Sequence, residues 1–300
     1  MINRRTFNKL TEYLITRSIR LAGYLSILYV ALICLFLIRE GFPALFNVPF
    51  SSLFGITWYP IEGHFGILPL FLGSLTITFG AILISVPLGI ATAVFISEIA
   101  PPWVNQVFKP LIEILAGIPS VVLGFIGILV LSPFLRRFLD LPTGLTAFTG
   151  ALLLGWVAIP SIVSVAEDAL NTVPRSYREA SLALGANRWQ TIWGVTVPAA
   201  RNGILTAVML GIGRVIGETM AVMMVTGNAP TMPNLLSLFQ PVRTMTATIA
   251  SEMGEVATNS THYQVLFFIG IVLFILSLVI NVIAFLISSR RMKRSERLLS

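Results

Sequence analysis

The chain has 300 residues, of which 56% are hydrophobic and 11% are charged, and its mean hydropathy is +0.88. Soluble proteins carry roughly 25% charged residues, so this composition excludes a soluble domain and indicates a polytopic membrane protein. The net charge of +7 does not indicate nucleic-acid binding, because most basic residues flank apolar runs, where they orient insertion into lipid. The single cysteine, Cys34, excludes an intrachain disulfide and a thiolate metal site. We expect no metal and no cofactor, and we interpret His64 and His262 as ordinary surface residues.

Residues 1–66 predict an N-terminal basic segment, a first membrane span and an external loop. Residues 1–20 carry five basic side chains, a pattern that fits a helix on the membrane surface. The apolar run Leu21–Ile38 is longer than the core of a signal peptide, and no small-x-small cleavage site follows it. We therefore predict a retained span rather than a signal peptide.

Five more apolar runs predict the rest of the membrane domain, residues 67–289, before a basic tail at 290–300. Gly and Pro interrupt several runs, notably at Gly117-Ile118-Pro119-Ser120, and a span tolerates them only where neighbouring protein satisfies the freed backbone groups. The sequence thus predicts an all-α protein with six transmembrane helices. The predicted second to sixth spans are Leu68–Ile96, Val107 or Leu111 to Leu135, Thr146–Val165, Gly203–Val225 and Tyr263–Ser288.

The distribution of Lys and Arg predicts the orientation of these spans. Fifteen of the 20 basic residues face the side that holds both termini and the connector between the fourth and fifth spans, and four face the other side. Arg214 is left within the membrane. Because Lys and Arg are enriched in cytoplasmic loops, we predict cytoplasmic termini for a multi-pass inner (plasma) membrane protein surrounded by lipid. Residues 39–66 and 229–262 are then external.

The connector, residues 174–198, has the pattern of two short helices joined by a turn. Pro174 suits a first helical turn, and Ser176 with Glu179 fits a capping box. Gly185 can take the left-handed conformation that ends a helix, and a second helix begins at Asn187. A protruding helix of this kind can seat in a groove of a partner and transmit motion to the fifth span. The alternative is that both helices only pack on their own chain. Capping boxes are common in helices, so this one does not by itself indicate a docking site.

The connector also matches a family signature. Glu179-Ala180-Ser181, three residues, Gly185, nine residues and Val195-Thr196-Val197-Pro198 resemble the EAA signature of ABC importer permeases, which is EAA, three residues, Gly, nine residues and I-x-L-P. The departures are Ser181 for Ala, Val195 for Ile and Val197 for Leu. In that family the loop docks into the ATP-hydrolysing subunit, so the resemblance implies a cytoplasmic ATPase partner. The implied coupling residues are Glu179, Ala180, Ser181, Gly185 and Pro198.

Two ionisable residues, Arg214 and Glu218, stand in the middle of the predicted fifth span. They are four residues apart, so a continuous helix places them on one face. Ionisable side chains at this depth mark a solute pathway or a pairing, so a structural salt bridge is the alternative interpretation. Gly213 and Gly217 form a G-x-x-x-G beside them, which lets another helix approach closely.

The stretch RVIGETMAVMMVTGN at 214–228 resembles the fifth span of phosphate-specific ABC importer permeases of the PstC type. The resemblance covers about 68–286 and includes GSL at 73–75 and RTMTATIASEMGE at 243–255. It implies the type I ABC importer permease architecture, phosphate as substrate, and a substrate pathway at Arg214, Glu218 and Thr219. It also implies three partners: a homologous PstA-type permease, a dimer of ATP-binding subunits and an external phosphate-binding protein. The chain lacks the Walker-type G-x-x-x-x-G-K-[ST], so we expect no catalytic residues and no enzymatic activity of its own.

Phosphate gives the charged residues a chemical purpose. The dianion cannot cross a low-dielectric region without a cationic partner, and a guanidinium offers two parallel hydrogen bonds to phosphate oxygens. Glu218 would compete for Arg214 and help to release the ion. Two alternatives stay open: an ABC permease for another oxyanion such as sulfate or molybdate, and a secondary transporter that uses Glu218 as a proton relay. The connector disfavours the second, because ion-coupled transport needs no ATPase dock.

Overall fold

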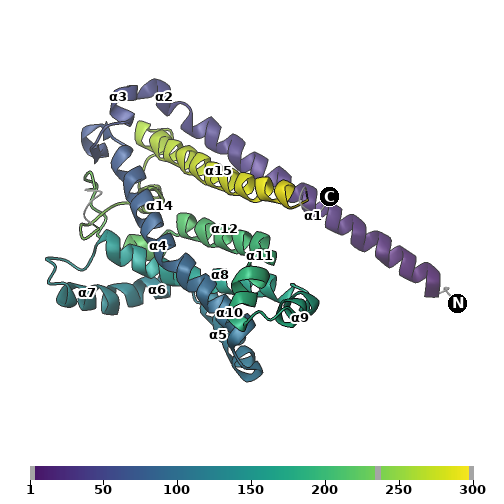
Figure 1. Ribbon diagram of the computed structural model, residues 1–300. Helices are drawn as coiled ribbons and strands as arrows, with labels where there is room; N and C mark the ends of the chain where they lie inside the picture. Colours follow the sequence, from purple (N-terminus) through teal and green to yellow (C-terminus); the bar gives the residue numbers. More distant parts are fainter. Residues whose placement is uncertain (1–3, 234–237, 297–300) are drawn as a thin grey trace.

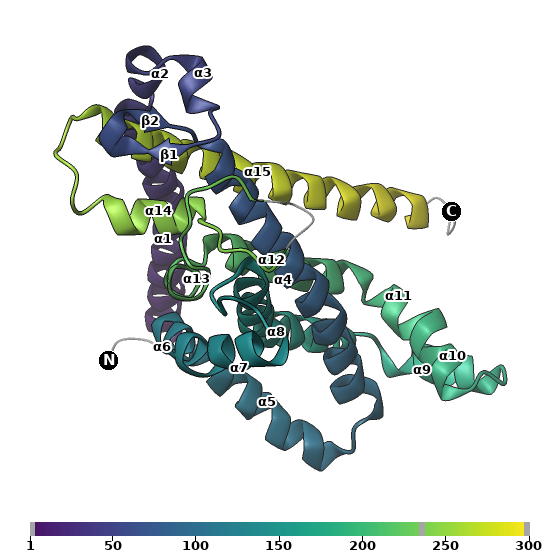
Figure 2. The same ribbon diagram turned by 90° about the vertical axis from the view of Figure 1, so that its left-hand side faces the viewer.

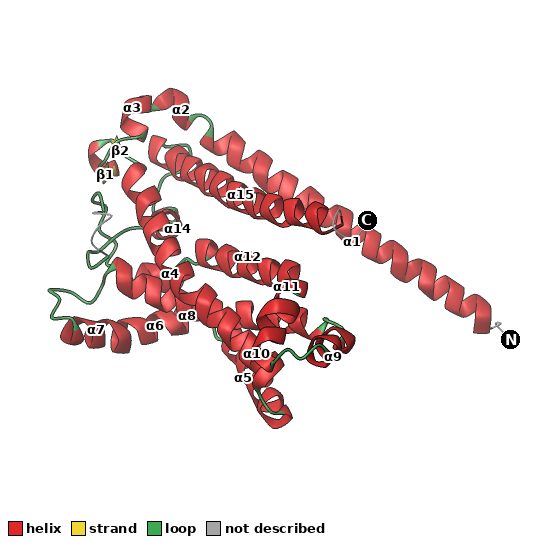
Figure 3. Cartoon of the chain, viewed as in Figure 1, coloured by secondary structure: helices red, strands yellow, loops and turns green. Residues whose placement is uncertain are grey.

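The computed structural model describes residues 4–233 and 238–296 and consists almost entirely of helices (Figure 3). Within these residues, five helices are long and apolar enough to cross a membrane. A sixth span results if the pair Arg188–Ala199 and Arg201–Gly217, bent by 71°, counts as one. The prediction of an all-α, polytopic fold is confirmed. Arg297, in the predicted basic tail, lies outside the described residues. The five candidate spans, some of which run through adjoining helical elements, are Glu12–Asn47, Leu68–Ile99, Ser120–Phe138, Ala147–Asn171 and Thr261–Ile283.

The N-terminal helix α1 (Arg4–Gly41) is a single helix of 38 residues. At 1.5 Å per residue such a helix is about 57 Å long, whereas the hydrocarbon core of a bilayer is about 30 Å thick. The prediction of a separate surface helix over residues 1–20 is therefore wrong, because no proline and only one internal glycine, Gly23, interrupt the helical run. Helix α1 lies alongside α15 (Thr261–Glu296), and its N-terminal half projects beyond the rest of the chain (Figure 1).

Residues 44–65, here called the cap segment, cover one end of the helices. The segment contains α2 (Ala44–Asn47), α3 (Phe50–Leu53) and the 3-10 turn η1 (Pro60–Glu62). The strands β1 (Trp58–Tyr59) and β2 (His64–Phe65) pair in antiparallel fashion with Trp58 opposite Phe65. Leu53 and Trp58 are buried in one apolar cluster with Met245 and Leu266. Burial of these large side chains attaches the cap segment to the C-terminal part of the chain.

His262 is not an ordinary surface residue, so that interpretation is wrong. Its Nε2 lies 2.8 Å from Oε2 of Glu252, and the other oxygen of Glu252 lies 2.7 Å from Nη2 of Arg243. The Trp58 indole N–H also donates to Glu252 over 3.1 Å. This cluster links the cap segment to α14 (Met245–Glu252) and to the start of α15. His64 is exposed, as predicted.

Helix α8 (Ala147–Asn171) is the centre of the membrane domain and packs against α4 (Leu68–Val94) and α12 (Arg201–Gly217) (Figure 2). Glycines allow this close approach, because a methyl group added at Gly89 or Gly211 would lie 2.7 Å or less from Ile162 of α8. Lipid tails are as apolar as the helix surfaces, so close van der Waals packing of this kind holds membrane helices together.

Two of the predicted spans contain breaks. The third begins as α5 (Pro102–Gly117) and resumes as α6 (Ser120–Ile126), the π-helical turn η3 (Gly127–Leu131) and α7 (Ser132–Phe138). The fifth stops at the end of α12 and resumes as α13 (Met220–Val225). Helices α6 and α13 pack together, so the two breaks lie in neighbouring elements. The first interruption was predicted from its Gly and Pro, whereas the second was not.

The connector lies at the end of the molecule opposite the cap segment (Figure 1). The N-terminal end of α1 and the C-terminal end of α15 point toward the connector's side in the same view. The π-helical turn η2 (Phe95–Ile99) follows α4 there. The connector itself consists of α9 (Arg175–Ala183), α10 (Arg188–Thr191), the π-helical turn η4 (Ile192–Thr196) and α11 (Val197–Ala199).

Candidate functional site

Both predicted helices of the connector form, but their caps differ from the prediction. Pro174 is the N-cap of α9, so Ser176 lies inside the first turn and cannot cap the helix. The prediction of a capping box at Ser176 and Glu179 is therefore wrong. The capping box instead begins α10: Asn187 Oδ1 accepts from the Gln190 N–H over 2.9 Å, and Gln190 Oε1 accepts from the Asn187 N–H over 2.8 Å.

The turn between α9 and α10 depends on Gly185. Its φ of +88° confirms the predicted left-handed conformation. Apart from its two neighbours in the chain, no described residue lies within 4 Å of the position that a Cβ would occupy, so the backbone conformation rather than crowding favours glycine here. Ser181 Oγ lies 3.0 Å from Thr191 Oγ1 and so links the two helices. The hydroxyl that departs from the family signature thus contributes to the shape of the connector.

Arg178 anchors the connector to the membrane helices. Its Nε lies 3.1 Å from Oε2 of Glu98, which belongs to η2 at the end of α4. Its Nη1 and Nη2 donate to the backbone carbonyls of Val173 and Leu170 over 2.7 and 3.0 Å. Only 7% of the Glu98 side chain is exposed. The sequence does not predict this pair, because nothing in the spacing of the two residues indicates that they meet.

The outer surface of the connector exposes several large apolar side chains. No residue of α9 is buried, and Leu184, Trp189 and Trp193 are 90%, 59% and 58% exposed. Exposed apolar surface of this kind marks interaction sites, and aromatic residues are enriched in protein interfaces. Of the predicted coupling residues, Ser181 is half-buried, and the exposed ones are Glu179, Ala180, Gly185 and Pro198.

Arg214 lies in the last turn of α12 and joins three helices. Its Nη1 donates to Oγ of Ser161 in α8 over 2.7 Å, and its Nη2 donates to the carbonyl of Ala116 near the end of α5 over 3.2 Å. The side chain is half-buried. Both acceptors are uncharged, so the positive charge of the guanidinium is not neutralised by these contacts.

Glu218 does not pair with Arg214 among the described residues. The prediction of one continuous helix through both is wrong, because Glu218 is the C-cap of α12, with an extended ψ of 129°. Its carboxylate turns to the next segment and accepts from the backbone N–H groups of Thr219 and Ala221 over 3.1 and 3.4 Å. These amides would otherwise lack partners at the start of α13. Thr219 Oγ1 donates to the Gly217 carbonyl over 3.2 Å.

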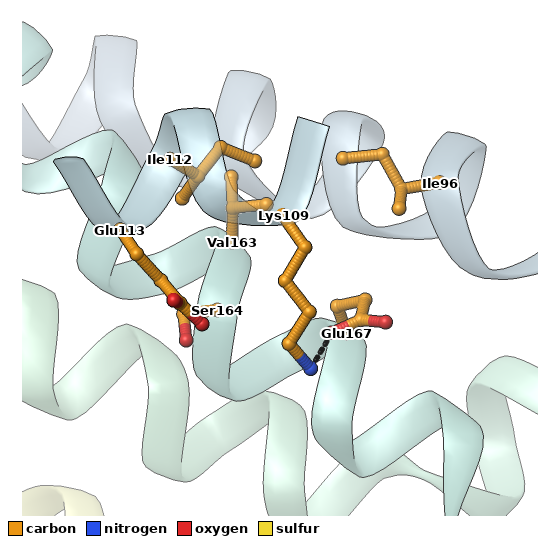
Figure 4. A pocket seen from close by; sticks show the side chains of 7 residues that line it. All are labelled: Ile96, Lys109, Ile112, Glu113, Val163, Ser164 and Glu167. Carbon is orange, nitrogen blue, oxygen red and sulfur yellow. Dashed lines mark hydrogen bonds and ion pairs between the residues drawn. The ribbon is translucent and has the colours of Figure 1, made fainter. Parts of the chain in front are cut away.

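A cavity of about 410 Å³ opens beside Arg214, between α5, α8 and α12. Its polar lining consists of Arg214, Ser161, Ser164 and Glu113. Glu113 and Ser164 also line a neighbouring small pocket, which leads to Lys109 and Glu167 (Figure 4). Together the two spaces form a row of polar side chains, here called the polar seam, between α5 and α8. The sequence alone does not predict this seam.

Lys109 closes one end of this seam. Its Nζ lies 2.9 Å from Oδ1 of Asp168 and 3.1 Å from Oε2 of Glu167 (Figure 4 shows the second contact). The hydrogen bond to Asp168 and, to a smaller extent, the one to Glu167 raise the pKa of Lys109 above its usual value. The ammonium group is therefore charged at neutral pH, and its two contacts hold α5 against α8. Helix α5 itself is not among the helices that are long and apolar enough to span a membrane.

Comparison with known proteins places these features in context. The model of the family described as "Binding-protein-dependent transport system inner membrane component" matches residues 85–294. The chain is 42% identical over 245 residues to the "Probable ABC transporter permease protein YqgH" of Bacillus subtilis, covering 81% of this chain and 79% of the relative. It is 34% identical over 294 residues to the "Phosphate transport system permease protein PstC" of Mesorhizobium japonicum, covering 92% of this chain and 89% of the relative.

The fold also matches a solved structure. A chain of the bacterial alginate ABC transporter, solved with an alginate pentasaccharide-bound periplasmic protein, superposes with a TM-score of 0.64 at 15% sequence identity. The match covers 97% of this chain and 99% of that one. At this identity the likeness concerns the fold alone.

Proposed function

Because the chain belongs to the family of binding-protein-dependent transport system inner-membrane components, we propose that it is the permease subunit of an ATP-driven importer of inorganic phosphate. The observation that carries the substrate is the 34% identity to a phosphate permease over 92% of this chain. The chain is a multi-pass membrane protein and a transport subunit, and we assign ATP hydrolysis to a partner.

The connector supports coupling to such an ATPase. Its exposed apolar side chains, Leu184, Trp189 and Trp193, offer a surface for the partner, while Gly185 fixes the angle between its helices. The Arg178–Glu98 pair joins α9 to the end of α4, so a force on the connector reaches the membrane helices. We propose Glu179, Ala180, Ser181, Gly185 and Pro198 as residues of this coupling loop.

The contacts of Arg214 support its role in the phosphate pathway. Ser161 and the Ala116 carbonyl are neutral acceptors. A phosphate adds its own negative charge and can accept two parallel hydrogen bonds from the guanidinium, so it can displace them. Glu218 competes with the incoming anion, because its carboxylate already occupies the amides of Thr219 and Ala221. This competition keeps the ion from being held too tightly at the break.

The proposed importer needs three partners. A homologous PstA-type permease completes the membrane pathway, a dimer of cytoplasmic ATP-binding subunits docks on the connector, and an external phosphate-binding protein delivers the ion. We assign residues 1–66 to the first span with its loop, 67–289 to the permease domain and 290–300 to a cytoplasmic tail. Both termini face the cytoplasm in the inner membrane, which agrees with the excess of basic residues on that side.

Reconstitution of the complete importer in proteoliposomes tests this function. We expect uptake of labelled phosphate that requires ATP and the phosphate-loaded binding protein and that persists when a protonophore removes the proton gradient. ATP-independent uptake that the protonophore abolishes would identify a secondary transporter instead. Uptake of labelled sulfate or molybdate in place of phosphate, with their own binding proteins, would overturn the substrate assignment.

A further inference from the structure

The cavity beside Arg214 contains a second charged group, Glu113, to which the sequence alone gives no role. Among the described residues that line this cavity, Arg214 is the one base and Glu113 is the one acid. Glu113 lies on α5, one helical turn before Ala116, whose carbonyl accepts from Arg214. The two charges therefore share one cavity of about 410 Å³, to which Ser161 and Ser164 add hydroxyl groups.

The carboxylate of Glu113 is available to a ligand. It makes no hydrogen bond or ion pair within the described part of the chain, and the residue is exposed to the open cavity. Figure 4 shows the side chain pointing from α5 toward Ser164 of α8. The acids nearby differ in this respect: Glu218 is bound to backbone amides, and Glu167 is bound to Lys109.

We propose that Glu113 is a specificity-determining residue, whose carboxylate accepts a hydrogen bond from a protonated oxygen of the phosphate that Arg214 binds. This inference rests on the proposed function and adds a criterion for the substrate. The site then selects tetrahedral oxyanions that still carry a proton at neutral pH.

The chemistry follows from what each group can do. An ionised carboxylate only accepts hydrogen bonds, and a guanidinium only donates them. Phosphate at neutral pH has both kinds of oxygen, because it retains at least one proton, and so it can satisfy Arg214 and Glu113 together. Sulfate has no proton to donate and meets an unpaired negative charge. Specificity built on repulsion of the wrong ligand in this manner is common in binding sites.

Equilibrium binding to the purified complex of permeases and ATP-binding subunits in detergent, without the external binding protein, tests the inference. Labelled phosphate is competed with unlabelled phosphate, arsenate or sulfate at neutral pH and constant ionic strength. In the wild type we expect arsenate, which also retains a proton, to compete within about threefold of phosphate, and sulfate at least tenfold more weakly. In Glu113→Gln the amide can donate to any oxyanion, so sulfate should compete within about threefold of phosphate.

Three variants complete the design. Glu12→Gln removes an exposed carboxylate of α1 and should compete as the wild type does. Glu113→Asp keeps the carboxylate and should retain the preference for phosphate, which keeps the test valid if the Gln variant assembles poorly. Arg214→Gln should lose phosphate binding at least tenfold.

The outcomes separate the two levels of the proposal. An unchanged preference for phosphate over sulfate in Glu113→Gln would overturn the role of Glu113, and the proposed function would stand if Arg214→Gln still lost binding. Normal phosphate binding by Arg214→Gln, or none by the wild type, would overturn both the pathway and the inference drawn from it.

Discussion

Arg178 and Glu98 are 80 residues apart in the sequence and form an ion pair that fastens the connector to the end of α4. The same guanidinium holds the carbonyls of Val173 and Leu170, where α8 gives way to the connector. One side chain therefore joins α9 to two membrane helices. This contact gives the connector a direct link to the end of α4.

The first prediction concerns this joint. Arg178→Gln leaves the Glu98 carboxylate buried without its partner, a change that costs about 3–5 kcal/mol in buried pairs. Because Arg178 itself is 22% exposed, we expect a loss toward the lower end of that range. Phosphate uptake should fall at least tenfold, while the variant still inserts into the membrane. Arg175→Gln changes an exposed arginine on the same helix and should transport normally. Equal uptake by both variants would show that the pair does not transmit force.

The second prediction uses the left-handed conformation of Gly185. A left-handed backbone costs a residue with a Cβ roughly 1–2 kcal/mol, so Gly185→Val should distort the turn, weaken ATPase binding and reduce uptake. Gly185→Asn should retain more activity, because Asn tolerates this conformation. Gly194 has equally open surroundings and no positive φ, so Gly194→Val is the matched control. Retention of the ATPase on the purified permease is the measurement, and a cysteine placed at Ala183 should cross-link to the ATPase subunit.

Much of the fold could be predicted from the sequence, because hydropathy and basic flanks report directly on membrane spans. The basic residues of 1–20 suggest a surface helix separate from the first span, whereas the absence of proline from residues 4–41 lets α1 continue as one helix. The motif Gly73-Ser74, noticed only as a resemblance, has a physical reason in the fold. A side chain at Gly73 would collide with the Arg243 carbonyl, and Ser74 Oγ accepts from the Met245 N–H over 3.0 Å.

The candidate site was harder to predict, because its geometry depends on contacts between distant elements. The break at Glu218 contains no proline and is stabilised by the carboxylate of Glu218 and by Thr246, whose Oγ1 donates to the Glu218 carbonyl over 3.2 Å. The four-residue spacing of Arg214 and Glu218 in the sequence favours an ion pair between them, which the break prevents. Glu113 is one acid in an apolar helix, and only the packing of α5 against α8 and α12 brings it to the same cavity.

The third prediction concerns the G-x-x-x-G face of α12. Apart from the adjoining backbone of α12, no atom of the described residues lies within 4 Å of a Cβ added at Gly213 or Gly217, and both residues are exposed. We expect the second permease to pack here, because small residues allow close approach of helices in membranes. Gly213→Leu should therefore leave the single chain stable but prevent its co-purification with the partner. Gly23→Leu, on an open face of α1, is the control. Normal co-purification of Gly213→Leu would place the interface elsewhere.

The fourth prediction is the topology. Reporter fusions that end after Asn187 or at the C-terminus should be active as cytoplasmic reporters, because the basic residues concentrate on that side. Fusions that end near Gly55 or Met253 should report an external position. These two sites should agree with each other, since the Trp58–Glu252 hydrogen bond joins the cap segment to α14. A cytoplasmic reading at either site would contradict the predicted orientation.

The last prediction separates the charges of Arg214 and Glu218 from their structural contacts. Arg214→Lys keeps the charge but loses the planar fork that binds phosphate with two parallel hydrogen bonds, so it should assemble and transport at least tenfold more slowly. Glu218→Gln keeps a side-chain oxygen that can accept from the amides of Thr219 and Ala221, whereas Glu218→Ala leaves those amides without it. If the negative charge helps to release phosphate, both Glu218 variants lose uptake, and only the Ala variant also loses complex yield. Labelled phosphate uptake and the yield of assembled complex are measured on the same membranes. Full uptake by Glu218→Gln, together with failure of Glu218→Ala, would assign Glu218 to the shape of the helix break rather than to the passage of the ion.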